Sequence, residues 1–152
     1  MIVALCALAA AGAVLYVRRR TLVITVKGVS MRPTLSAGDV LIGRRVRARR
    51  LRSGQIVVVE KPNPGEDWKS WSWPERSRHL MIKRLAALPG EPVPAAVRGR
   101  LGTGAVPPGA VVVLGDNLAE SVDSREIGYF PLERVVGVAL RTYTRGPRDI
   151  GR

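Results

Sequence analysis

Two residues of this chain have the types and settings needed for nucleophilic chemistry. Ser30 follows Gly28 and precedes Pro33, a pattern that predicts a stiff turn exposing its hydroxyl. Lys83 is the one lysine of four that apolar residues flank on a predicted strand. Burial lowers a lysine pKa, and a neutral amine accepts a proton from a serine hydroxyl. Taken singly, Ser30 also fits a turn former and Lys83 a strand-end lysine whose ammonium reaches water.

A polar block at residues 115–125 is a third segment that could take part in this chemistry. Its Gly-Asp-Asn start is typical of a tight turn, and Asp123 and Arg125 are spaced to pair across a bend. Ser121 lies in the same bend, where it either accepts a hydrogen bond from Lys83 or donates one to the neutral amine, and we favour such a lysine-orienting role. The alternative is a serine that only caps its turn.

Cysteine and histidine are too scarce for several other chemistries. Cys6 and His79 are the only residues of their kinds, so an internal disulfide and a Cys/His zinc site are both excluded. A Ser-His-Asp arrangement would have to use His79. We therefore expect no metal and no organic cofactor.

Length and composition favour one small folded domain. The chain has 152 residues, 46% of them hydrophobic, and a formal net charge of +13. Aromatic residues make up only 5%, which leaves few side chains for base stacking and argues against a nucleic-acid partner. We predict a monomer.

The strand pattern predicts an all-β domain. Short runs rich in β-branched residues alternate with Gly/Pro breaks, and no long amphipathic helix is evident. The predicted strands are residues 21–27, 40–42, 55–60, 80–88, 111–114 and 135–143.

The N-terminal segment, residues 2–17, carries no charge and ends at Arg18. We interpret it as a transmembrane anchor within residues 1–20, because a helix of this length is about 24 Å long and tilt or arginine snorkelling extends its reach. A cleaved signal peptide and a buried core helix are the alternatives. We assign residues 21–145 to the folded domain and 146–152 to a tail. The arginines after the run favour a cytoplasmic domain by charge bias alone.

Two segments have unusual composition. Residues 44–52 contain six arginines, which we interpret as a solvated loop, with anionic head groups or phosphates as the alternative partners. Residues 63–78 contain all three tryptophans, which fit a membrane interface or a cover for a sheet edge equally well.

The segments around Ser30 and Lys83, together with the polar block at residues 115–125, closely resemble the type I signal peptidase family. Members of this family are membrane-anchored Ser–Lys endopeptidases. SMRPTL, IKRLAALPGE and GDNLAESVDSREIG stand in the family's order and approximate spacing. The resemblance implies antiparallel sheets around an apolar groove, Ser30 as nucleophile and Lys83 as general base. It also implies that Ser121 orients the lysine. The other matches, Asp116, Asp123 and Arg125, would brace the site.

The chain departs from well-known members at two positions. Gly28 stands where some members place a serine that helps hold the oxyanion, and Gln55 replaces a usual aspartate. The oxyanion would then depend mainly on the backbone N–H of Ser30.

The resemblance further implies signal-peptide-bearing preproteins as substrates. It places the domain on the outer face of the cell membrane, with a single span and membrane lipids as partners, against the charge bias. Two alternatives remain: a maturation protease for one secreted client, and a non-catalytic membrane-tethered binding module.

Overall fold

The computed structural model describes residues 2–61 and 79–144. Most of the folded part is one antiparallel sheet, in the strand order β1-β2-β7-β3-β4-β5-β6. The prediction of an all-β, antiparallel domain is confirmed. The tryptophan-rich segment, residues 63–78, and the predicted tail lie outside the described residues.

The strands occupy nearly the predicted positions. Their bounds are β1 Thr21–Thr25, β2 Val40–Arg44, β3 Ile56–Glu60, β4 Leu80–Ala87, β5 Ala110–Leu114, β6 Phe130–Pro131 and β7 Val135–Tyr143. β1 stops two residues earlier than predicted, where Val26 N–H donates to the carbonyl of Asp39 at 2.8 Å. The two-residue β6 was not predicted. A four-residue helix, α2 (Arg98–Leu101), and several single 3₁₀ turns complete the domain.

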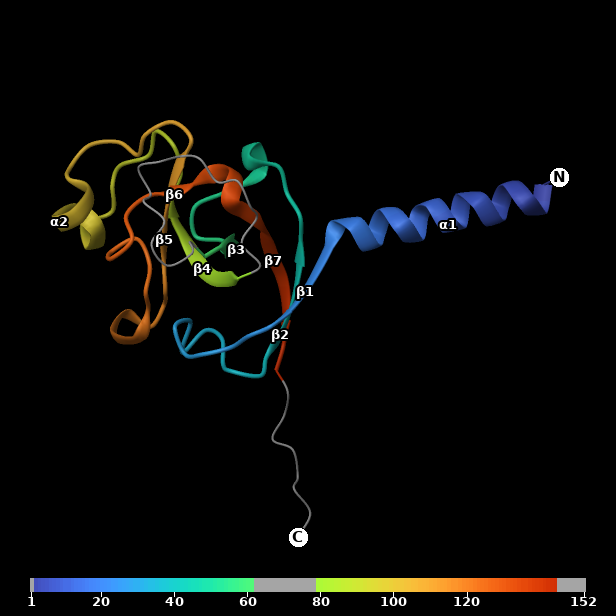
Figure 1. Ribbon diagram of the computed structural model, residues 1–152, viewed down its shortest axis with the longest axis horizontal. Coiled ribbons are helices and arrows are strands. Elements are labelled where there is room, and N and C mark those ends of the chain that lie inside the picture. The colour runs from blue at the N-terminus through green and yellow to red at the C-terminus, as the bar shows by residue number, and fades with distance from the viewer. Residues whose placement is uncertain (1, 62–78, 145–152) are drawn as a thin grey trace, which may run out of the picture.

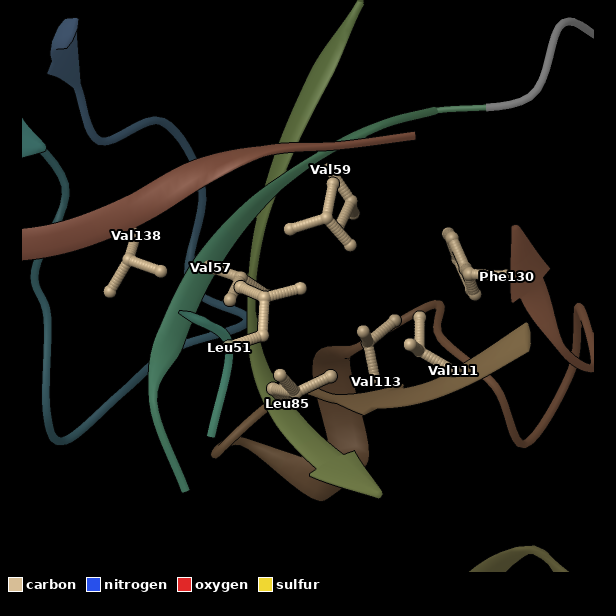
Figure 2. Close-up of a cluster of buried hydrophobic side chains, with 9 residues drawn as sticks. Leu51, Val57, Val59, Leu85, Val111, Val113, Phe130 and Val138 are labelled. Carbon is tan, nitrogen blue, oxygen red and sulfur yellow. The ribbon is translucent and has the colours of Figure 1, made fainter. Parts of the chain in front are cut away.

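The central strand β3 contributes to two hydrophobic clusters because its side chains alternate between the faces of the sheet. Val57 and Val59 belong to a cluster with Leu85 and Phe130, which Figure 2 shows between the strands. Val58 belongs to a second cluster that includes Met31. The loop that carries Ser30 is therefore fastened to the core by the residue that follows it.

The N-terminal segment forms one helix, α1 (Ile2–Arg20), which extends away from the β-domain (Figure 1). It continues through the arginines that end the apolar run. Its described apolar side chains are largely exposed, with Leu8 at 71% and Val17 at 58%. Among the described residues, no helix combines the length and hydropathy needed to cross a membrane. The predicted transmembrane helix is thus not confirmed.

Candidate active site

Lys83 lies in the middle of β4 and its side chain points into the domain. It pairs with Val57 of β3, and strand alternation places it on the same side as the core residue Leu85. Only 3% of Lys83 is exposed. Burial is the largest influence on its ammonium and lowers the pKa of Lys83 below its ordinary value.

A hydrogen-bonded chain joins Lys83 to the polar block. The Lys83 amine donates to Ser121 Oγ at 2.8 Å, and Ser121 Oγ donates to Asp123 Oδ2 at 2.8 Å. An ionised carboxylate only accepts hydrogen bonds, so the single hydroxyl proton of Ser121 is directed to Asp123. Of the two directions that the sequence left open, the structure therefore matches the one in which Ser121 accepts from Lys83.

Arg125 and the backbone hold Asp123 in place. The guanidinium contacts both carboxylate oxygens, at 3.0 Å through Nε and 2.9 Å through a terminal nitrogen, and Gly115 N–H donates to Oδ2 at 2.8 Å. Burial alone would raise the pKa of Asp123. The hydrogen bonds from Arg125, Gly115 and Ser121 outweigh burial and lower that pKa, so the carboxylate stays ionised.

Ser30 and Lys83 line the same pocket. Its volume is about 460 Å³, and its walls come from residues 24–28, from Ser30 and Met31, from the start of β4, and from Lys61, Glu120 and Val122. Within the described residues, no hydrogen bond joins the Ser30 hydroxyl to the Lys83 amine, and the Ser30 N–H has no backbone acceptor. The amine, the hydroxyl and a free N–H donor are thus present around one cavity.

The Gly-Asp-Asn turn at the start of the polar block is hydrogen-bonded to the Ser30 loop. Asn117 N–H donates to Ser30 O at 2.9 Å, and the Asn117 side-chain amide donates to Val29 O at 3.1 Å. A methyl group on Gly115 would lie 2.6 Å from Ser30 O and would also collide with Ser121. Only glycine permits this approach. The positioning roles of Asn117 and Gly115 were not predicted, although both residues belong to the polar block at residues 115–125.

Asp116 fastens the same turn from its other side. It accepts two hydrogen bonds from Arg84, at 2.7 and 2.6 Å, and one from Thr34 Oγ1 at 2.5 Å. The hydrogen bonds from Arg84 lower the pKa of Asp116. The contact joins the Ser30 loop to β4 beside Lys83.

The structure brings all six predicted site residues into one region. Ser30 and Lys83 share a pocket, Ser121 contacts Lys83 directly, and the pair Asp123–Arg125 lies one contact further away. Asp116 does not touch the amine and contacts only the surrounding scaffold. Among the described residues, no three histidine, cysteine or acidic side chains are grouped to hold a metal ion.

Comparison with known proteins relates this chain to a family of proteases. The family model described as signal peptidase, peptidase S26, matches residues 1–101 and 95–144. The chain is 32% identical over 135 residues to "Mitochondrial ATP-independent inner membrane protease subunit 1a" of Arabidopsis thaliana, covering 83% of this chain and 73% of that protein. It is 31% identical over 140 residues to "Probable signal peptidase I-2" of Synechocystis, covering 78% of this chain and 61% of the relative.

A third relative is "Signal peptidase I" of Bacillus caldolyticus, 28% identical over 147 residues, with 74% of this chain and 73% of that protein covered. The chain thus spans from about three fifths to about three quarters of the length of these relatives. It belongs to the signal peptidase family, peptidase S26. Its class is accordingly that of the signal peptidase I-like serine proteases, which are hydrolases.

Proposed function

We propose that this chain is a membrane-associated endopeptidase that removes signal peptides through a Ser30–Lys83 dyad. The observation that carries the proposal is a buried lysine with a lowered pKa in the pocket that Ser30 lines. A neutral amine in such a position is a general base for a neighbouring hydroxyl. The names of the family and of two relatives supply the class of substrate.

The reaction has two stages. Lys83 takes the Ser30 proton as Oγ attacks the scissile carbonyl, and the Ser30 N–H stabilises the oxyanion. Protonated Lys83 then gives its proton to the leaving amine, and the acyl group remains on Ser30. In the second stage Lys83 activates a water molecule, which hydrolyses the ester.

Ser121 keeps the Lys83 amine in position throughout this cycle. Because its hydroxyl proton is held by Asp123, Ser121 offers a lone pair to one N–H of the amine. The nitrogen lone pair of the neutral amine then stays available for the Ser30 proton. Ser121 acts through Lys83, so it is a positioning residue.

We expect the pocket to hold an extended peptide. Residues 24–26, at and just beyond the end of the edge strand β1, line the cavity together with the start of β4. A peptide backbone can pair with such an edge. The family resemblance implies preproteins with small side chains near the cut, and the apolar residues Ile24, Met31 and Ile82 would contact them.

We place the enzyme at the membrane, with α1 as its attachment. The relatives include a protein named as an inner membrane protease, and the described apolar side chains of α1 are exposed. In this proposal the helix spans the bilayer once, and the catalytic domain acts as a monomer on the extracytoplasmic side. Deleting residues 1–20 should leave cleavage of short peptides intact and weaken cleavage of membrane-bound precursors.

The decisive experiment compares cleavage of a signal-peptide-bearing precursor by purified wild type, Ser30→Ala and Lys83→Ala in detergent. Ser36→Ala and Arg141→Ala are matched controls, because both residues are exposed and neither lines the pocket. We expect the first two variants to lose cleavage while retaining wild-type circular dichroism, and the controls to remain active. Substantial cleavage by folded Lys83→Ala would eliminate Lys83 as the base. A panel of unrelated precursors separates a general enzyme from a protease with one client.

A further inference from the structure

A second cavity, of about 300 Å³, lies where α1 meets the segment between β2 and β3. Tyr16 and Val46 contribute to its lining, and arginines make up the rest. We call it the arginine pocket. Its arginines are Arg20, Arg44, Arg45, Arg47, Arg49 and Arg50.

The fold holds these arginines together although they come from separate segments. Thr21 pairs with Arg44 between β1 and β2, and Arg45 N–H donates to Arg20 O at 2.8 Å. Val46 packs against the main hydrophobic cluster, to which Leu51 also belongs. The 3₁₀ turn Ala48–Arg50 lies between these two apolar anchors. The arginines of residues 44–52 are exposed, as the solvated loop predicted from composition requires, and the segment is in addition fastened at both ends.

The charges in the arginine pocket lack acidic partners among the residues that the structure describes. Within the described part of the chain, none of its six guanidinium groups forms an ion pair, whereas Arg84, Arg125 and Arg134 each do. Arg20 lies over the ring of Tyr16, with 5.2 Å between the guanidinium carbon and the ring centroid. Like charges collected in one cavity repel each other and attract anions. Arginine is well suited to phosphate because its planar group donates two parallel hydrogen bonds.

We propose that the arginine pocket binds the phosphate groups of anionic phospholipids. Its position identifies the source of the phosphate, because Tyr16 and Arg20 belong to α1, the helix assigned to the membrane. The described apolar side chains Val14, Leu15 and Val17 are exposed next to the pocket in sequence. Lipid head groups at the membrane surface would neutralise the arginines there, on whichever side of the bilayer the domain lies. This inference rests on the proposed membrane association.

The test measures flotation of the full-length chain with vesicles at limiting lipid. One vesicle is pure phosphatidylcholine and the other contains about 30 mol% phosphatidylglycerol, since each basic residue near an anionic surface strengthens binding several-fold. The variant is Arg47→Gln/Arg49→Gln/Arg50→Gln. The matched control, Arg98→Gln/Arg100→Gln/Arg141→Gln, removes the same charge from exposed arginines outside the pocket.

We expect wild type and the control to prefer the anionic vesicles by about tenfold or more, and the pocket variant to lose most of this preference. Raising the salt from about 0.1 M to about 1 M, which shortens the Debye length to about 3 Å, should remove it for all three. Equal losses in the two triple variants would overturn the inference, because net charge alone would explain them. Displacement from vesicles by millimolar inorganic phosphate, or tighter binding to a short single-stranded RNA, would also overturn it.

Cleavage of a soluble signal peptide in neutral detergent separates this inference from the proposed function. Both triple variants should cleave at the wild-type rate there, because no arginine of the pocket lines the cavity of Ser30. Wild-type cleavage without any preference for anionic vesicles refutes the lipid site alone. An inactive wild type with a clear preference refutes the endopeptidase and leaves the lipid site standing.

Discussion

The substitution Ser121→Ala removes the one side chain that joins Lys83 to the Asp123–Arg125 pair. Its hydroxyl makes two hydrogen bonds of 2.8 Å. All three hydrogen-bonded residues are buried: Lys83 is 3% exposed, Ser121 5% and Asp123 0%. A buried hydrogen bond contributes about 0.5–1.5 kcal/mol, and a buried polar group left without its partner costs about 1–3 kcal/mol. We therefore expect a stability loss of about 1–3 kcal/mol.

The same substitution should reduce the rate by more than the stability loss explains. Without its acceptor, the Lys83 amine has no side chain that fixes its orientation toward Ser30. We expect kcat to fall by about 10–100-fold, equivalent to about 1.4–2.7 kcal/mol of transition-state free energy, with KM little changed. Because a hydrogen-bond acceptor favours the charged amine, its removal lowers the pKa of Lys83 further. The acid limb of the kcat/KM profile should move to lower pH.

Ser124→Ala is the matched control for Ser121→Ala. Ser124 is fully buried, and its hydroxyl accepts a hydrogen bond of 3.0 Å from Val113 N–H instead of contacting Lys83. This variant should lose a similar amount of thermal stability and retain its rate per folded molecule. The assay is kcat, KM and Tm for both variants at several pH values. A lowered Tm with unchanged kcat/KM in Ser121→Ala would remove Ser121 from the positioning residues and leave a simple dyad.

Three further changes test other parts of the site. Activity of the wild type should fall as pH drops through the lowered pKa of Lys83, and the pH profile of His79→Ala should be the same; loss of the acid limb in that variant would make His79 the base. Lys83→Met should abolish cleavage yet raise Tm at neutral pH, because burial disfavours the ammonium. The gain in Tm should shrink as pH rises toward 10.5, the ordinary pKa of lysine. A gain independent of pH would show that it does not come from the buried ammonium. Gly115→Ala should lower both Tm and kcat, because the added methyl group would lie 2.6 Å from Ser30 O; a wild-type kcat would show that the Ser30 loop tolerates displacement.

Local patterns were sufficient to predict most strands and the position of Lys83. The β-branched runs of β3 and β5 and the Gly/Pro breaks around them carry information within a few residues. β6 has only two residues, one of them Pro131, so it offers no alternation to detect. Its pairing with β5 depends on tertiary structure.

The sequence could not predict contacts between distant segments. The side chain of Asn117 reaches a carbonyl 88 residues away in the chain, and only the closed fold brings the two together. The sequence also left the direction of the Lys83–Ser121 hydrogen bond open. It is set by Asp123, whose carboxylate takes the hydroxyl proton, and this depends on a bend that places residues 121 and 123 on the same side. Sequence motifs therefore predicted which residues form the site, while their hydrogen-bond roles depend on the three-dimensional fold.

The pairing of Asp123 with Arg125 explains why a carboxylate so close to Lys83 does not raise the pKa of the amine above its ordinary value. Burial lowers the pKa of Lys83, whereas the charge of Asp123 raises it and that of Arg125 lowers it. Arg125 donates hydrogen bonds to both oxygens of Asp123. Its positive charge therefore offsets the effect of the carboxylate on Lys83, and burial determines the direction of the pKa shift. Removing Arg125 alone would expose Lys83 to the bare carboxylate and raise its pKa. The predicted consequence of Arg125→Gln is an acid limb at higher pH, the opposite direction from Ser121→Ala, and a shift in the same direction in both variants would contradict this account of the charges.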